Sequence, residues 1–144
     1  MRFMILVKAD QNSEAGVLPD ENLLTEMGKY NEQPVKAGVL LSGEGLHPSF
    51  RGARVKFSGD KRTVVDGPFA EAKELVAGFW LIQVESKEEA IEWVKRIPDP
   101  MPGTETEIGL RQVFEADDFG PALTPELREQ EEQLRSSADR LRKK

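Results

Sequence analysis

The residues of this sequence that can do acid–base chemistry gather around two short segments, residues 43–49 and 66–74. Those that can move a proton are His47, Asp66, Glu71 and Glu74. An imidazole or a carboxylate within hydrogen-bond reach of a substrate proton can act as a general acid or base. Because His47 is the only histidine of the chain, any imidazole base must be this residue. The pattern predicts a proton-transfer site, although each residue could also be an ordinary loop or surface side chain.

Side chains that could hold a small ligand lie in the same part of the chain, namely Glu44, Arg54, Phe69 and Lys73. Arg54 and Lys73 would attract an anion, and the planar guanidinium of arginine can bind a carboxylate through two hydrogen bonds. A carboxylate could fix the tautomer of the His47 imidazole, and the candidates are Glu44, three residues before His47, and Asp66, which would have to approach in space. Phe69 is either an aromatic wall of a pocket or a plug of the core, and we favour the plug.

Several classes of site are missing from the sequence. The chain has no cysteine, which excludes disulfides, thiolate nucleophiles and cysteine metal ligands. With one histidine and no EF-hand spacing we expect no metal site. Without a P-loop or a GxGxxG motif we expect no nucleotide or other cofactor. The formal net charge of −6 disfavours direct nucleic-acid binding, which depends on Lys and Arg contacts to phosphate.

The turn Asp66-Gly67-Pro68-Phe69 separates two strand-like runs. Gly67 supplies either a backbone torsion or a clearance that a Cβ would prevent, and Pro68 fixes its own φ. Asp66 has two compatible roles: its carboxylate could cap amides of the turn, or it could project into a cleft beside the sheet.

The elements that must position these residues begin with an apolar run at residues 3–7, which predicts a central strand covered on both faces. The polar stretch 9–16 indicates a loop. A helix is expected to open at residues 19–21, where a proline and two acids suit the positive end of the helix dipole. Pro34 should end or kink this helix. Its apolar face is formed by Leu23, Leu24, Met27 and Tyr30.

The remaining elements surround an inserted hairpin. Residues 38–43 predict a second strand, residues 53–57 and 63–65 a β-hairpin, and residues 76–84 the strongest strand of the chain. Ser86 and Glu89 match a capping box that opens a second helix, which Pro98 ends. The core face of that helix consists of Ala90, Ile91, Val94 and Ile97. Residues 104–114 supply the last strand.

The order β-α-β, a hairpin and β-α-β is the split βαβ pattern of a ferredoxin-like α+β fold. Two helices cover one face of such a sheet, and no further helix within residues 1–115 is predicted for the other face. An uncovered apolar sheet face would aggregate. We therefore expect a homodimer in which two sheets pack against each other.

Residues 1–120 are predicted to form this domain, and residues 121–144 a charged helical tail. Thr124 and Pro125 are typical of a helix N-cap followed by proline at the first helical position. Leucines recur every seven residues in the tail, but the other seam positions are not apolar. These leucines are Leu127, Leu134 and Leu141. We expect a helix that lies on the domain or on a partner chain, and not an independent coiled coil.

No stretch approaches the roughly 20 consecutive apolar residues of a membrane span. The apolar run at residues 3–7 is shorter than a signal-peptide core, and no small-residue cleavage site follows it. We expect a soluble cytoplasmic protein without a membrane partner.

Four blocks of the sequence, in the same order and spacing, resemble the YCII-related family and, within it, the DGPF branch. They are GVLLSGEGL (38–46), VVDGPFAEAKELVAGFWLI (64–82), EEAIEWVKRIP (88–98) and RQVFEADDFG (111–120). The resemblance covers residues 1–120. It implies a ferredoxin-like α+β domain that forms a dimeric α/β barrel.

The resemblance implies less about activity. Relatives proposed to act on small cyclic or aromatic-derived compounds use a histidine early in the first helix and an aspartate near its end. Here those stretches are residues 20–22, which hold no histidine, and residues 35–37, which hold no aspartate. The dyad of those relatives therefore does not carry over. Members of the DGPF branch are often encoded beside, or fused to, extracytoplasmic-function sigma factors.

Two functions remain open at this point. In the first, the chain binds or converts a small organic acid by proton transfer in a cleft near residues 66–69. In the second, it is a non-catalytic regulatory module whose partner is a sigma factor.

Overall fold

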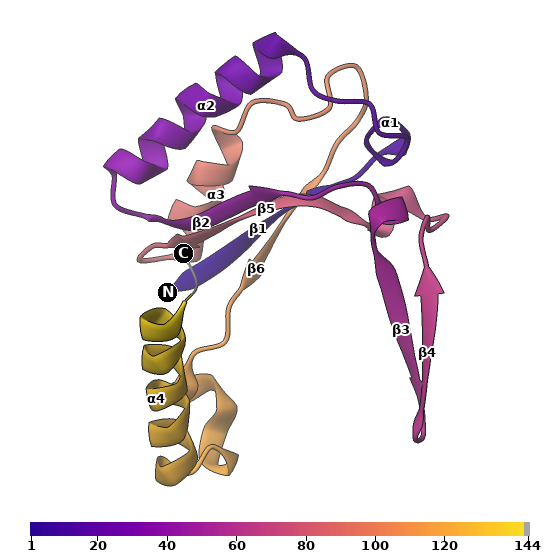
Figure 1. The fold of residues 1–144 in the computed structure, drawn as a ribbon. Helices are drawn as coiled ribbons and strands as arrows, with labels where there is room; N and C mark the ends of the chain where they lie inside the picture. The colour runs from indigo at the N-terminus through magenta and orange to yellow at the C-terminus, as the bar shows by residue number, and fades with distance from the viewer. Residues whose placement is uncertain (143–144) are drawn as a thin grey trace. The chain divides into compact units, whose positions relative to one another are not determined.

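The computed structural model describes residues 1–142 of the chain, which divides into two compact units. The first unit is Met1–Gln112, and the second begins at Val113. Figure 1 shows the helices and strands of both. The domain boundary expected after residue 120 stays a prediction.

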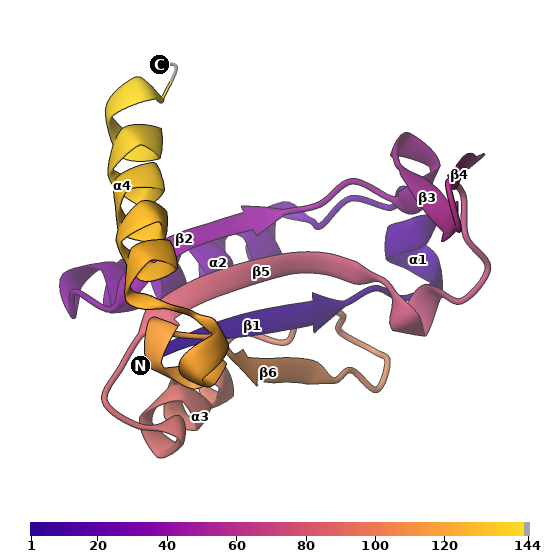
Figure 2. The ribbon, with the colours of Figure 1, turned by 90° about the horizontal axis from the view of Figure 1, so that it is seen from below.

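A four-stranded antiparallel sheet forms the centre of the first unit. Its strands lie in the order β2-β5-β1-β6, so the first strand of the chain is inside the sheet (Figure 2). The strands are β1 (Arg2–Lys8), β2 (Leu40–Gly45), β5 (Val76–Gln83) and β6 (Ile108–Gln112). The predicted α+β class and the order of the elements along the chain are confirmed, while β2 begins later, and β6 is shorter, than the sequence indicated.

Two helices, α2 (Glu21–Lys36) and α3 (Lys87–Lys95), cover one face of this sheet (Figure 1). The hydrophobic core consists of Phe3, Ile5, Tyr30, Ile82, Val84, Ala90 and Trp93. The Tyr30 hydroxyl donates a hydrogen bond of 2.9 Å to the carbonyl oxygen of Trp93 and so links the two helices. Burial raises the pKa of Tyr30 to about 12, and the charge of Arg96 opposes this shift.

Helix α2 runs further than its sequence predicts. It begins after Asp20, whose carboxylate accepts a hydrogen bond of 2.8 Å from a backbone N–H of the first turn. The helix continues to Lys36, so the expected break at Pro34 is wrong. Pro34 is fully buried, and the packing of its ring offsets the backbone hydrogen bond that proline cannot donate. Leu24 is 59% exposed, so the apolar face of the helix is narrower than expected.

Two local predictions, a loop at residues 9–16 and a capping box at Ser86 and Glu89, differ from the hydrogen bonds seen at the two helix N-termini. The polar stretch after β1 is not only a loop, because it contains the short helix α1 (Gln11–Glu14), capped by Asp10. Helix α3 begins after Ser86 as predicted, and the Ser86 hydroxyl accepts the Glu89 N–H at 3.1 Å. The Glu89 carboxylate, however, accepts the N–H of Glu85 at 3.0 Å and not that of Ser86.

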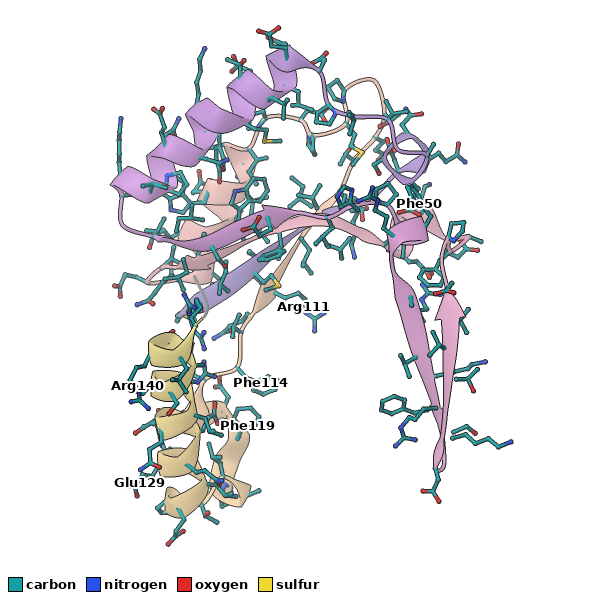
Figure 3. The ribbon with its side chains drawn as sticks, in the orientation of Figure 1. Phe50, Arg111, Phe114, Phe119, Glu129 and Arg140 are labelled. Atoms are coloured by element: carbon teal, nitrogen blue, oxygen red, sulfur yellow. The ribbon has the colours of Figure 1, made fainter. Side chains whose placement is uncertain are left out.

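The second face of the sheet is not covered by any helix within residues 1–112. Along β1, the side chains toward the helices are buried and the alternate ones only half-buried. Within residues 1–112 the helices thus cover one face of the strand, and the cover expected on its second face stays a prediction. The strand register places Met4, Leu6, Phe79, Leu81 and Arg111 on the second face. Arg111 projects away from α2 and α3 (Figure 3). We call these five residues the open sheet face.

The inserted hairpin consists of β3 (Ala53–Ser58) and β4 (Lys61–Asp66). All residues of both strands are exposed. The hairpin leaves the end of the sheet and extends on the side of the open sheet face (Figures 1 and 2). It is therefore a projecting ribbon and not part of the central sheet.

The second unit contains the 3-10 segment η3 (Ala116–Ala122) and the helix α4 (Pro125–Leu141). Thr124 caps α4 and proline occupies its first position, as predicted. Phe114 and Phe119 stack with their ring centroids 4.9 Å apart (Figure 3). No helix among residues 1–142 is long and apolar enough to cross a membrane.

Candidate functional site

The Asp66-Gly67-Pro68-Phe69 segment leaves β4 and lies against the loop that precedes β3. The Gly67 N–H donates a hydrogen bond of 3.0 Å to the Gly52 carbonyl oxygen, and the Gly67–Pro68 peptide bond is cis. A Cβ on Gly67 would lie 1.8 Å from the carbonyl oxygen of Ser49. The φ of Gly67 is not positive. Of the two predicted roles, Gly67 thus provides clearance and not an unusual torsion.

Ser49 ties this segment to the beginning of the chain. Its hydroxyl accepts a hydrogen bond of 2.9 Å from the Phe69 N–H and donates one to the Glu14 carboxylate. The same carboxylate accepts the Ser49 N–H at 2.9 Å. Glu14 is the last residue of α1. Helix α1 is therefore bonded to segment 43–49 through the Glu14 carboxylate. Segment 66–74 is bonded in turn to the hydroxyl of Ser49.

Arg54 and Phe69 are the two predicted ligand-binding residues that the structure brings into contact. The guanidinium carbon of Arg54 lies 3.9 Å from the centroid of the Phe69 ring, a cation–π distance. Phe69 is half-buried and outside the core cluster, so the favoured core plug is wrong. The reason is its position in a segment that follows the hairpin beyond the end of the sheet (Figure 1).

The stacked face of Arg54 leaves the N–H donors around the edge of its guanidinium available, because these donors lie in the plane of the group. No hydrogen bond or ion pair within the described part of the chain uses them. Arg62, at the other end of the same hairpin, also stacks on an aromatic ring, that of Phe57, at 4.2 Å. Its Nη1, in contrast, donates to the carbonyl oxygens of Gly59 and Lys61 at 2.8 and 3.0 Å.

His47 is exposed, and its neighbour is Arg51. Nη1 of Arg51 lies 3.5 Å from Nε2 of His47, at the long limit of a hydrogen bond. A guanidinium only donates, so the direction of this contact depends on the tautomer of the imidazole. Among residues 1–142, neither Glu44 nor Asp66 forms a hydrogen bond or ion pair with His47. The His–carboxylate pair considered from the sequence is not formed in this structure.

The other predicted residues are separate, exposed side chains. Asp66 ends β4 and Glu44 lies in β2. The 3-10 turn η2 (Ala72–Glu74) holds Lys73 and Glu74 and follows directly after Glu71. In the described residues, none of these five side chains forms a hydrogen bond or ion pair. Their assignment to a site stays a prediction.

Three residues of this region were missed from the sequence: Glu14, Ser49 and Arg51. Glu14 and Ser49 are 35 positions apart, and no local pattern connects them. They meet because α1 and the 3-10 turn η1 (Ser49–Arg51) lie together. The one usable signal was Asp10, a favourable N-cap residue that could have indicated α1.

Arg51 and Arg54 are cationic side chains of this region, and His47 is its imidazole. A guanidinium can bind an anion and an imidazole can transfer a proton. Over the part of the chain that the structure describes, no group of three His, Asp or Glu side chains is placed to hold a metal ion.

Comparison with known proteins identifies the family. The model of the YCII-related domain matches residues 1–114. An uncharacterised protein of Rhizobium meliloti (strain 1021) is 33% identical over 85 residues, which cover 59% of this chain and 68% of that protein. The chain also resembles the solved structure of the 5-chloro-2-hydroxyhydroquinone dehydrochlorinase (TftG) from Burkholderia phenoliruptrix AC1100, in complex with 2,5-dihydroxybenzoquinone. That match has a TM-score of 0.46 and 18% identity, and it covers 82% of this chain and 98% of the other. Because the family model spans most of its length, the chain belongs to the YCII-related domain family.

Proposed function

We propose that this YCII-related domain binds a small organic acid beside the Arg54–Phe69 contact and moves a proton on it. The observation that carries the proposal is the free edge of the Arg54 guanidinium, whose face is fixed on the Phe69 ring. A carboxylate would accept two parallel hydrogen bonds from that edge. The Phe69 N–H is hydrogen-bonded to the Ser49 hydroxyl, which fixes the backbone of the residue on which the Arg54 guanidinium stacks.

His47 is the residue that we assign to proton transfer. Its Nε2 faces Arg51 at a distance typical of a weak hydrogen bond. A ligand carboxylate that binds Arg51 would draw the guanidinium away and leave Nε2 open to accept a proton. The carboxylates Asp66, Glu71 and Glu74 are the further proton acceptors of the proposal.

The proposal extends to assembly. We propose that two copies pack through the open sheet face into the dimeric α/β barrel that membership of the DGPF branch would imply. The half-buried apolar side chains of Met4, Leu6, Phe79 and Leu81 favour such packing, because they would lose the remaining contact with water.

The experiment is a thermal-shift screen of small carboxylic acids, each paired with its neutral amide. A ligand that binds only the folded state raises the melting temperature by mass action. We expect shifts for acids but not for amides in the wild type, and loss of the shift in Arg54→Gln. Arg96→Gln is the matched control, because Arg96 also stacks on an aromatic ring, that of Trp93, at 4.7 Å.

His47→Gln separates binding from chemistry in the same screen. It should keep the shift caused by the best acid and lose proton exchange on that ligand, followed by NMR in D2O. Acids that shift Arg54→Gln as strongly as the wild type would show that the anion site lies elsewhere.

A second candidate function, the regulatory module, is favoured by the exposed leucines of α4. Leu127, Leu134 and Leu141 are 47%, 63% and 72% exposed. They are spaced seven residues apart, which places them on one side of the helix. We propose that they contact the sigma-factor partner suggested by the family resemblance. Deletion of residues 121–144 should abolish capture of that factor, and unchanged capture would remove α4 from the interaction.

A further inference from the structure

We infer that the β3–β4 hairpin is an arm that grips a second copy of this chain. The inference rests on the proposed homodimer and goes beyond it, because it assigns a second contact outside the packing of the two sheets. Three independent observations carry it: the exposure of the hairpin, its direction and its charge.

The first observation is an apolar side of the hairpin that stays exposed, although the Arg62 guanidinium stacks on its Phe57 ring at 4.2 Å. Val55 and Val64 are paired across the strands, and Phe57 lies two residues further along on the same side. These three side chains are 54%, 64% and 71% exposed. A two-stranded hairpin is at best marginally stable alone in water. A packing partner on this side would therefore stabilise the hairpin as well as bury the three side chains.

The second observation is the direction of the hairpin. It leaves the end of the sheet and extends on the side of the open sheet face, as Figures 1 and 2 show from two directions. A copy that packs on the open sheet face would lie on that same side, where the arm could also contact it. In a twofold dimer each copy would contribute one arm, which makes the contact reciprocal.

The third observation is charge. The hairpin residues 53–66 include four basic and two acidic residues, which give a net charge of +2. The whole chain has a net charge of −6, so the other residues carry −8. A basic arm is complementary to the acidic remainder of another copy. A nucleic acid would attract the arm but be repelled by the rest of the chain, which favours the second copy as partner.

Sedimentation equilibrium of the full chain tests the arm. Phe57→Ser and Val64→Thr each remove buried apolar area from both arms of a dimer, and we expect the dimer Kd to rise at least about tenfold. Leu24→Ser is the matched control, since Leu24 is 59% exposed on α2, and its Kd should not change. A monomeric wild type overturns both the dimer and the arm, whereas an unchanged Kd in both hairpin variants overturns the arm alone.

A cross-link identifies the occupant directly. The chain has no cysteine, so Asp60→Cys in the hairpin turn gives a single thiol for a photoactivated cross-linker. In a mixture of ¹⁴N-labelled and ¹⁵N-labelled chains, we expect cross-linked peptides of mixed isotope composition. Peptides linked only within one chain overturn the inference, as does cross-linking to added duplex DNA in place of the second copy.

Discussion

The carbonyl oxygen of Ser49 occupies the space that a side chain on Gly67 would need. An ideal Cβ at Gly67 would lie 1.8 Å from that oxygen, and the hydroxyl of the same serine accepts the Phe69 N–H. The backbone and the side chain of Ser49 thus support the segment at two points. The close approach of the Ser49 carbonyl oxygen requires a glycine at position 67. The Phe69 N–H, which follows Pro68, is fixed by its hydrogen bond to the Ser49 hydroxyl.

Gly67→Ala should therefore destabilise the protein. The new methyl group meets backbone, which cannot swing aside as a side chain can, so we expect a loss near the upper end of the about 1–3 kcal/mol typical of overpacking. Urea unfolding followed by circular dichroism measures the change. Gly28→Ala is the control, because a Cβ there meets nothing within 4 Å and should stabilise α2 by about 0.5–1 kcal/mol. Wild-type stability for Gly67→Ala would contradict the contact.

The pair Glu14 and Ser49 should act as one unit. Ser49→Ala leaves the Phe69 N–H and the carboxylate without their shared partner, at a cost of about 1–2 kcal/mol. In a double-mutant cycle with Glu14→Ala, we expect a coupling free energy of at least about 0.5 kcal/mol. Ser86→Ala, which removes the cap of α3, should be additive with Glu14→Ala. Additivity at Ser49 as well would show that the two side chains do not interact.

Tyr30 should give stability a measurable dependence on alkaline pH. Its folded-state pKa of about 12 lies above the usual value of 10.0, because burial disfavours the phenolate. Its contribution is present below pH 10 and is lost as the pH rises through 12, since the unfolded chain releases the proton first. Tyr30→Phe should lower stability at neutral pH by removing the bond to Trp93, and should weaken the decline between pH 10 and 12.

The wild type is the reference for the Tyr30→Phe variant at each pH, because the two proteins differ only at position 30. The measured quantity is the difference in unfolding free energy between the two proteins at each pH. A difference that stays constant from pH 8 to 12 would mean that Tyr30 does not titrate with a raised pKa.

Leu81→Arg should separate the proposed dimer. Leu81 lies on the open sheet face beside Met4, and a charge there would have to be buried between two sheets. We expect a folded monomer at micromolar concentration by sedimentation velocity. Leu24→Arg on the exposed side of α2 should leave the sedimentation coefficient unchanged. A Leu81→Arg dimer as tight as the wild type would place the interface elsewhere.

Local patterns of the sequence determined most of the elements. The apolar run of β1, the long strand β5, the serine cap of α3 and the threonine–proline start of α4 were all predicted, since strand alternation and helix caps act within a few residues. The α+β class followed from their order. The residues Arg54 and Phe69 were also selected from sequence, although not as partners.

Tertiary structure alone decided the rest. The Glu14–Ser49 tie joins residues 35 positions apart, the role of Gly67 depends on a distant carbonyl, and Pro34 stays helical because it is buried. Periodicity and capping carry no information about such contacts, because these depend on which loops the strand order brings to one end of the sheet. For the same reason Phe69 packs under Arg54 and outside the core, although its sequence context suggested the opposite.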